Sequence, residues 1–223
     1  QDKLLFLRKE GYSVKKAIVA ANIKSTLGES PFWNEEEQKL YWVDILGGKL
    51  HMLDPATAQE MTVDFQKPVA NAVVCGKGWI LALVDGLYYW GSDTGVMKPL
   101  GAPEGYRPEV RFNDGKCDAA GRLYIGTCSD IPGDAALYRW TPEKQWETVI
   151  KGVSTSNGIA WSNNNTKMYY IDTPTREIWS FDYDLTTGAM TNKQVAIQFL
   201  QTPGNPVLLH LLRDRRDHRR CAY

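Results

Sequence analysis

The sequence predicts an all-β fold of the β-propeller type, in which four-stranded sheets are arranged as blades around an axis. Short apolar runs of β-forming residues recur with centres near positions 41, 80, 124 and 169. Their steps of about 39, 44 and 45 residues fall in the range of one propeller blade per repeat. Apolar residues alternate with polar ones within the repeats, and helical periodicity is nearly absent.

Each repeat contains the same succession of elements. The central runs are KLYWVDI at 39–45, GWILALV at 78–84, RLYIGTC at 122–128 and KMYYIDT at 167–173. Turn-forming residues precede every run, and a second strand follows three of them, at 48–54, 135–141 and 176–182. A β-sandwich is the alternative, because its strands also recur regularly. The longer period, repeated three times, favours the propeller.

Composition excludes several classes of partner. The 223 residues suit one domain, which we expect to span residues 1–223. Lys plus Arg and Asp plus Glu number 26 each, so no net charge would recruit nucleic acid. No run of about eighteen apolar residues is present, which argues against a membrane-spanning helix. The composition therefore predicts neither nucleic acid nor a membrane as a partner.

The two ends depart from the repeat pattern. The chain starts at Gln1 rather than Met, so we expect a fragment, and residues 1–20 are charged and irregular. In residues 201–223 the β pattern stops and five Arg occur within nine residues. This anomalous stretch is expected to be non-native, from a shifted reading frame or a false splice, or else a solvated, disordered tail; a nucleic-acid-binding arm is a further alternative.

Four cysteines are scattered along the chain: Cys75, Cys117, Cys128 and Cys221. None lies in a Cys-x-x-Cys pair or in the Cys-His spacing of a zinc site. The expected state is reduced thiols in a cytoplasmic protein. A disulfide between Cys117 and Cys128, which flank one expected hairpin, is the alternative.

Three polar residues occupy comparable places in their repeats. Glu29, Asn113 and Asn157 each stand just before an apolar strand start. In a propeller such residues begin the innermost strands and point into the central channel, so we expect them to converge. Carboxylate and amide oxygens suit a hard cation such as Ca²⁺, Mg²⁺ or Mn²⁺. Turn formation is the alternative for each of them.

Neighbouring polar residues receive different interpretations. Arg111 lies two residues before Asn113, on the same face of an expected strand, where it would hold a substrate carbonyl or hydroxyl. A surface position is its alternative. Asp44 and Asp172 are interpreted as turn or hydrogen-bonding residues inside their blades rather than as catalysts, and Asp114 as a residue that caps a turn. No Ser-His-Asp grouping and no Gly-rich phosphate loop can be argued.

Together these strings resemble a known family. GESPFWNEEEQKLYWVDI, RFNDGKCDAAGRLYIGT, ALYRW and SNGIAWSNNNTKMYYIDT, in this order, are similar to the senescence-marker-protein/gluconolactonase/regucalcin family. The resemblance spans about residues 25–199 and is strongest to its lactonase-type members. It implies a six-bladed propeller, of which about four blades are present here.

The resemblance also implies an activity. The family binds one divalent cation (Ca²⁺, Zn²⁺, Mn²⁺ or Mg²⁺) and hydrolyses sugar lactones such as gluconolactone. Glu29 and Asn157 match its metal ligands, and Arg111 and Asn113 match its substrate-contacting residues. The implied mechanism is polarisation of the lactone carbonyl by the cation while a carboxylate base activates water.

One part of the family pattern is missing. The base is an Asp in a Pro-Asp-Gly motif, and after VAIQFL this chain has QTPGNPVLLHLL instead. The catalytic residue is therefore unknown. Three hypotheses follow: a metal-dependent sugar lactone hydrolase, a regucalcin-like calcium-binding regulatory protein without significant turnover, or an inactive fragment lacking the catalytic Asp.

Overall fold

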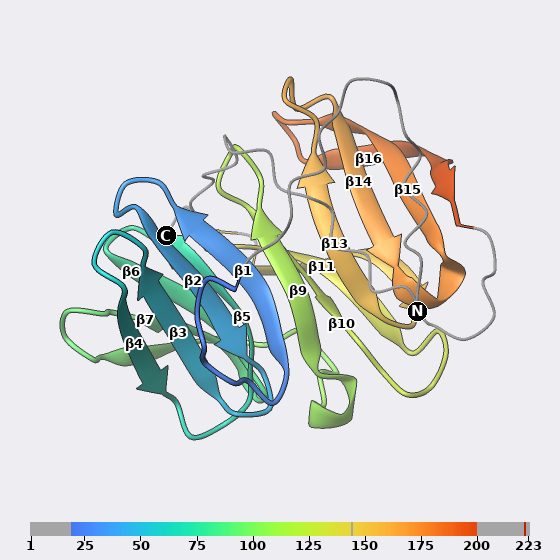
Figure 1. Cartoon of the computed structure of the whole chain (residues 1–223). Coiled ribbons are helices and arrows are strands. Elements are labelled where there is room, and N and C mark those ends of the chain that lie inside the picture. The colour runs from blue at the N-terminus through green and yellow to red at the C-terminus, as the bar shows by residue number, and fades with distance from the viewer. Residues whose placement is uncertain (1–18, 144, 200–220, 222–223) are drawn as a thin grey trace, which may run out of the picture.

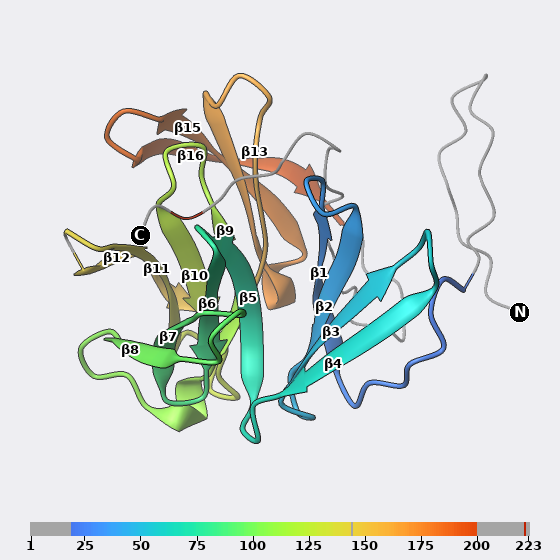
Figure 2. The same cartoon turned by 90° about the vertical axis from the view of Figure 1, so that its left-hand side faces the viewer.

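The described part of the chain forms four antiparallel sheets of four strands each, in a propeller arrangement. The computed structural model describes residues 19–143, 145–199 and 221. The sheets lie side by side around a common axis (Figures 1 and 2). The predicted all-β propeller with about four blades is confirmed.

Each blade takes its strands in chain order, so neighbours in sequence are neighbours in the sheet. Blade 1 contains β1 (Gly28–Asn34), β2 (Lys39–Asp44), β3 (Lys49–Asp54) and β4 (Gln59–Asp64). Blade 2 contains β5 (Val69–Cys75), β6 (Gly78–Leu83), β7 (Gly86–Trp90) and β8 (Met97–Gly101). Blade 3 contains β9 (Phe112–Cys117), β10 (Leu123–Thr127), β11 (Ala135–Thr141) and β12 (Gln145–Val153). Blade 4 contains β13 (Ser156–Trp161), β14 (Lys167–Asp172), β15 (Glu177–Asp184) and β16 (Ala189–Gln198). Two short 3₁₀ turns, η1 (Pro108–Val110) and η2 (Thr173–Thr175), precede β9 and follow β14.

Burial explains which strands the sequence pattern indicates. All residues of β5 and β6 are buried because blade 2 packs against blades on both faces, and their sequences are almost continuously apolar. Outer strands β4 and β16 are mostly exposed, and polar residues make up about half or more of each, so they carry a weaker apolar signal. These outer strands are the part of each blade that the repeat pattern does not predict.

The hydrophobic core consists of three layers, one between each pair of adjacent blades. Tyr41 of β2 packs on Trp79 of β6 between blades 1 and 2, with ring centroids 4.7 Å apart. Between blades 3 and 4, Tyr124 contacts Trp161 at 5.3 Å. The layer between blades 2 and 3 contains Ile80, Phe112 and Ile125, each at most 1% exposed. Apolar side chains on both faces of a blade thus hold the blades side by side.

Blades 3 and 4 are also joined by buried polar contacts. Asp118, in the turn between β9 and β10, is fully buried and pairs with Arg122 Nε at 2.6 Å. Its second partner is the hydroxyl of Tyr183 on β15, which donates to Asp118 Oδ2 at 2.5 Å. Arg122 also donates to the carbonyl of Leu185 at 2.5 Å and that of Thr186 at 3.2 Å. These contacts connect one turn of blade 3 to the outer turn of blade 4.

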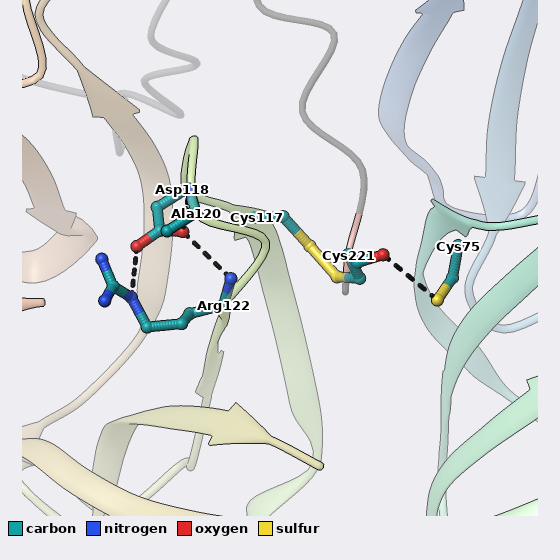
Figure 3. Close-up of a disulfide and its surroundings, with 6 residues drawn as sticks. All are labelled: Cys75, Cys117, Asp118, Ala120, Arg122 and Cys221. Atoms are coloured by element: carbon teal, nitrogen blue, oxygen red, sulfur yellow. Dashed lines mark hydrogen bonds and ion pairs between the residues drawn. A yellow bond between two sulfur atoms is a disulfide. The ribbon is translucent and has the colours of Figure 1, made fainter. Parts of the chain in front are cut away.

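A disulfide corrects the expectation of reduced thiols for two of the four cysteines. Cys117, at the end of β9, is bonded to Cys221 (Figure 3). Cys75 and Cys128 are free thiols, as expected. Cys221 also donates its backbone N–H to the carbonyl of Val74 on β5, at 3.1 Å. The Cys117–Cys128 alternative is wrong as well, because Cys117 is bonded to Cys221 and Cys128 is a free thiol. Pairing depends on which Cβ atoms meet in the fold, and sequence spacing does not reveal this.

Two of the sequence-based expectations concern the ends of the chain. Those for residues 1–20 and 201–223 fall almost entirely outside the described residues, so they stay predictions. No helix in the described ranges is long and apolar enough to cross a membrane.

Candidate functional site

The predicted site residues occupy equivalent positions at the starts of the inner strands. In three blades the first paired residue of the inner strand lies opposite the end of the second strand: Gly28 opposite Asp44, Phe112 opposite Thr127 and Ser156 opposite Asp172. Glu29, Asn113 and Asn157 each follow this residue. The strand register shifts directly after Glu29 and Asn157, and Asn113 lies within the irregular stretch between the paired residues Phe112 and Gly115. Such bulges re-aim side chains and are common beside functional sites. The starts of β1, β9 and β13 lie at the same, lower end of the arc in Figure 1.

Hydrogen bonds connect three of the four predicted residues directly. Arg111 Nη1 donates to Asn113 Oδ1 at 2.9 Å. Asn113 Nδ2 donates to Asn157 Oδ1 at 3.0 Å and to the backbone carbonyl of Ser156 at 2.7 Å. Asn157 is only 4% exposed, and its Nδ2 donates to Thr173 Oγ1 at 2.7 Å. The structure therefore joins Arg111, Asn113 and Asn157 into one polar run across blades 3 and 4.

Glu29 lies elsewhere on the arc of inner strands. It is half-buried near the start of β1, and β5 separates β1 from β9 along the arc. The residue after it, Ser30, has a left-handed backbone with φ of 49°, which produces the bulge at this position. Ser30 Oγ accepts a hydrogen bond at 3.0 Å from Asn71 Nδ2 of the next blade.

Asn71 and Thr173 are polar residues near the starts of the inner strands that the sequence analysis did not single out. Blade 2 has Ala70 at the position equivalent to Glu29, and Asn71, 3% exposed, follows it. Asn71 sits in the apolar string VANAVVC, where an isolated buried amide is the available signal. Thr173 follows Asp172 in a string read as a strand end, and nothing in the local sequence distinguishes it from a turn residue. Asp114 lies within β9 rather than in a turn, which corrects the expectation for that residue.

The donor chemistry fits a hard cation. Asn157 Oδ1 accepts one hydrogen bond from Asn113 and retains a second lone pair, and Glu29 supplies a carboxylate. Within the described ranges no group of three or more His, Cys, Asp or Glu side chains forms a metal cluster. A cation at the inner-strand starts would therefore have fewer than three His, Cys, Asp or Glu ligands from the described residues, and amide oxygens would complete that part of its ligand set. The position expected for the Pro-Asp-Gly motif lies outside those residues.

A cavity of about 460 Å³ lies away from these residues. Its lining includes Arg122, Arg139, Glu147 and Thr187, from the turns and outer strands of blades 3 and 4. Both guanidinium groups already bind protein acceptors, Asp118 for Arg122 and Glu147 for Arg139. None of the predicted site residues lines it, so this cavity is not the candidate site.

Two buried carboxylates hold the loops that lead into the inner strands. Asp44 accepts hydrogen bonds from the backbone N–H groups of Thr26 and Leu27, at 2.8 and 2.9 Å, and from that of Gly47. Asp172 accepts from the N–H groups of Ser154 and Thr155 in the same way. Their interpretation as hydrogen-bonding residues inside the blade is confirmed. They shape the backbone immediately before Glu29 and Asn157.

Asp44→Asn is expected to destabilise the protein at pH 7 and to make its free energy of unfolding depend less on pH in the acid range. Burial alone would raise the pKa of Asp44, but the N–H donors of Leu27, Thr26 and Gly47 outweigh it and lower the pKa below its ordinary value of 3.8. The carboxylate therefore stabilises the fold above about pH 4, and this contribution is lost as the pH falls through the lowered folded-state pKa. We expect a loss of about 1–3 kcal/mol at pH 7.

Urea unfolding at several pH values checks this expectation. The difference between wild type and Asp44→Asn should narrow as the pH falls below about 4 and through the lowered folded-state pKa of Asp44. Asp93→Asn, which changes an exposed turn carboxylate, is the control and should follow the wild type throughout. A constant difference at all pH values would contradict the role assigned to the Asp44 charge.

Comparison with known proteins identifies a matching family and similar proteins. Residues 27–206 match the family described as the SMP-30/Gluconolactonase/LRE-like region. The protein named "Putative sugar lactone lactonase YvrE" of Bacillus subtilis (strain 168) is 37% identical over 194 residues, which cover 85% of this chain and 66% of that protein. Pentonolactonase XacC of Haloferax volcanii is 30% identical, with 81% of this chain and 61% of that protein covered.

A solved structure is similar in fold and sequence. The structure of a calcium-binding protein, regucalcin, from Agrobacterium tumefaciens superposes with a TM-score of 0.74 and 25% identity. The match covers 79% of this chain and 61% of that chain. The chain thus spans about two thirds or less of the length of these relatives. The match of residues 27–206 to the family model shows that this chain belongs to the SMP-30/gluconolactonase/LRE-like family.

Proposed function

We propose that the protein is a divalent-metal-dependent sugar lactone hydrolase whose site lies at the starts of the inner strands. The observation that carries the proposal is the hydrogen-bonded polar run Arg111–Asn113–Asn157 at the starts of the inner strands, in a chain whose family includes named lactonases. Glu29 and Asn157 would hold one cation, Ca²⁺, Zn²⁺, Mn²⁺ or Mg²⁺, through oxygen atoms. When bound, the cation supplies Lewis acidity toward the lactone carbonyl and charge stabilisation for the oxyanion.

The chain's own residues would bind and orient the lactone. Arg111 presents a guanidinium with several donors. Its Nη1 donates to Asn113 Oδ1 and to the Phe112 carbonyl, and its other N–H groups suit a carbonyl or hydroxyl oxygen of a sugar lactone. Asn113 keeps Arg111 and Asn157 in fixed relation. Hydrolysis adds the water oxygen to the carbonyl carbon, and the ring oxygen leaves and takes a proton, giving a hydroxy acid. At neutral pH each turnover releases one proton.

A regucalcin-like calcium-binding role without significant turnover is the second candidate. Two observations favour it: the similarity to a calcium-binding regucalcin, and the lack of an assigned catalytic base among the described residues. Both candidates share the cation site and differ in turnover. Proton release from gluconolactone, measured with Ca²⁺, Zn²⁺ or Mn²⁺ and again with a chelator, separates them. Rates at the uncatalysed background under all conditions would exclude the hydrolase.

Glu29→Gln tests the cation site shared by both candidates. Removing the charge while keeping the side-chain shape is expected to weaken Ca²⁺ or Mn²⁺ binding by at least about tenfold, since ligand charge sets affinity for hard cations. Isothermal titration calorimetry of the whole chain measures this. Glu104→Gln, which changes an exposed loop carboxylate, is the matched control and should bind as wild type. Equal affinity for all three proteins would remove Glu29 from the site.

A further inference from the structure

Thr173 has a fixed position beside the polar run. It is the first residue of η2, and its backbone N–H donates to the carbonyl of Thr155 at 3.0 Å. The same turn is closed by Thr175 Oγ1, which donates to the carbonyl of Asp172 at 2.8 Å. Thr is β-branched and has few side-chain rotamers, so its hydroxyl oxygen is held in one place against the start of β13.

The hydrogen bonds determine which way each amide group is turned. Arg111 can only donate, so the atom of Asn113 that faces it is the carbonyl oxygen. The Asn113 NH₂ group then faces two acceptors, the Ser156 carbonyl and Asn157 Oδ1. Asn157 therefore turns its oxygen toward Asn113, and its own NH₂ group must find an acceptor on the opposite side. Thr173 Oγ1, at 2.7 Å, is that acceptor.

We propose that Thr173 is a positioning residue of the site, which accepts from the Asn157 NH₂ group so that the Asn157 carbonyl oxygen stays turned toward the cation position. The proposal rests on the proposed function only for what Asn157 Oδ1 binds; the orientation itself follows from the contacts. Asn157 is 4% exposed, so an unpartnered N–H there could not be satisfied by solvent. Without the Thr173 hydroxyl the amide would rotate in search of another acceptor and move its oxygen out of place.

Three substitutions separate this role from a structural one. Thr173→Val keeps the branched shape and removes the hydroxyl, whereas Thr173→Ser keeps the hydroxyl. Thr175→Val removes a hydroxyl from the same turn that bonds Asp172 rather than Asn157. Partners that orient metal ligands typically change affinity by about 10–100-fold. We expect Thr173→Val to weaken Ca²⁺ or Mn²⁺ binding by about tenfold or more, and both other variants to stay within about threefold of wild type.

The side-chain amide signal of Asn157 supplies a readout that needs no cation. In a ¹H–¹⁵N spectrum, assigned by its disappearance in Asn157→Asp, the NH₂ pair should shift and exchange faster in Thr173→Val. Thr173→Ser should restore the wild-type signal, and Thr175→Val should leave it unchanged. Folding of each variant is checked by far-UV circular dichroism and thermal unfolding.

The two measurements distinguish failure of this inference from failure of the proposed function. If wild type binds the cation and Thr173→Val binds it equally with an unshifted amide signal, the positioning role is overturned and the metal site stands. If wild type binds none of the tested cations but the amide signal responds as expected, the positioning role stands and the proposed metal dependence fails. An unchanged amide signal in Thr173→Val overturns the inference in every case.

Discussion

Alanine at position 118 is expected to lower the free energy of unfolding by about 3 kcal/mol, the low end of the range for breaking a buried ion pair. Asp118 is fully buried, whereas Arg122 is 14% exposed and keeps its carbonyl acceptors in blade 4, which limits the loss. The substitution also removes the acceptor of the Tyr183 hydroxyl. Figure 3 shows Asp118 and Arg122 paired beside the Cys117–Cys221 disulfide.

Urea unfolding monitored by tryptophan fluorescence measures this effect. Asp54→Ala is the matched control, because Asp54 accepts two turn N–H groups as Asp118 does but lies outside the contacts between blades. It should cost far less than Asp118→Ala. The double variant Asp118→Ala with Tyr183→Phe should lose less than the sum of the two single changes, since the two side chains are in contact. Additive losses would show that Asp118 does not couple the blades.

Gly126→Ala is expected to have the second large effect. It should lower the free energy of unfolding and also disturb the hydrogen bonds of the candidate site. Gly126 lies on β10, opposite Leu137, and a Cβ atom there would lie 1.8 Å from Ser156 Oγ and 2.1 Å from Ser156 Cβ. Ser156 is fully buried on β13, so blades 3 and 4 would have to move apart. Overpacking of this kind costs about 3 kcal/mol, and the shift would separate Asn113 from the Ser156 carbonyl and from Asn157.

A size swap provides the control for this prediction. Ser156→Gly in the Gly126→Ala background removes the clashing atoms and should recover most of the lost stability, as judged by thermal unfolding. Cation affinity should fall in Gly126→Ala and recover in the double variant together with stability. Destabilisation that persists in the double variant would mean that the strain arises from the β10 backbone rather than from Ser156.

The repeat pattern predicts the inner parts of the blades because packing on both faces requires apolar residues there. Runs such as GWILALV correspond to strands that are buried throughout, whereas outer strand β16 is almost entirely exposed and mixes polar with apolar residues, so it does not stand out in the pattern. The equivalent places of Glu29, Asn113 and Asn157 were also predictable, since each repeat has the same turn-then-strand order. Their assignment as metal ligands and substrate contacts stays a proposal.

The contacts made by these residues were not predictable from local strings. Asn71, Gly126 and Thr173 stand in unremarkable sequence, and each owes its role to a residue in another strand or blade. The same holds for the Cys117–Cys221 disulfide, whose partners are 104 residues apart in the chain.

The local pattern of apolar and turn-forming residues, which reflects burial and turn formation, was enough to predict four β blades and a polar residue at three inner-strand starts. Only the tertiary structure decided which side chains touch, because blade neighbours are about 40 residues apart in sequence and hydrogen-bond geometry is set by distances of a few ångströms. The orientation of the Asn113 and Asn157 side-chain amides in the polar run, with Thr173 beside it, is the clearest case. It depends on the donor and acceptor atoms that two separate blades bring together.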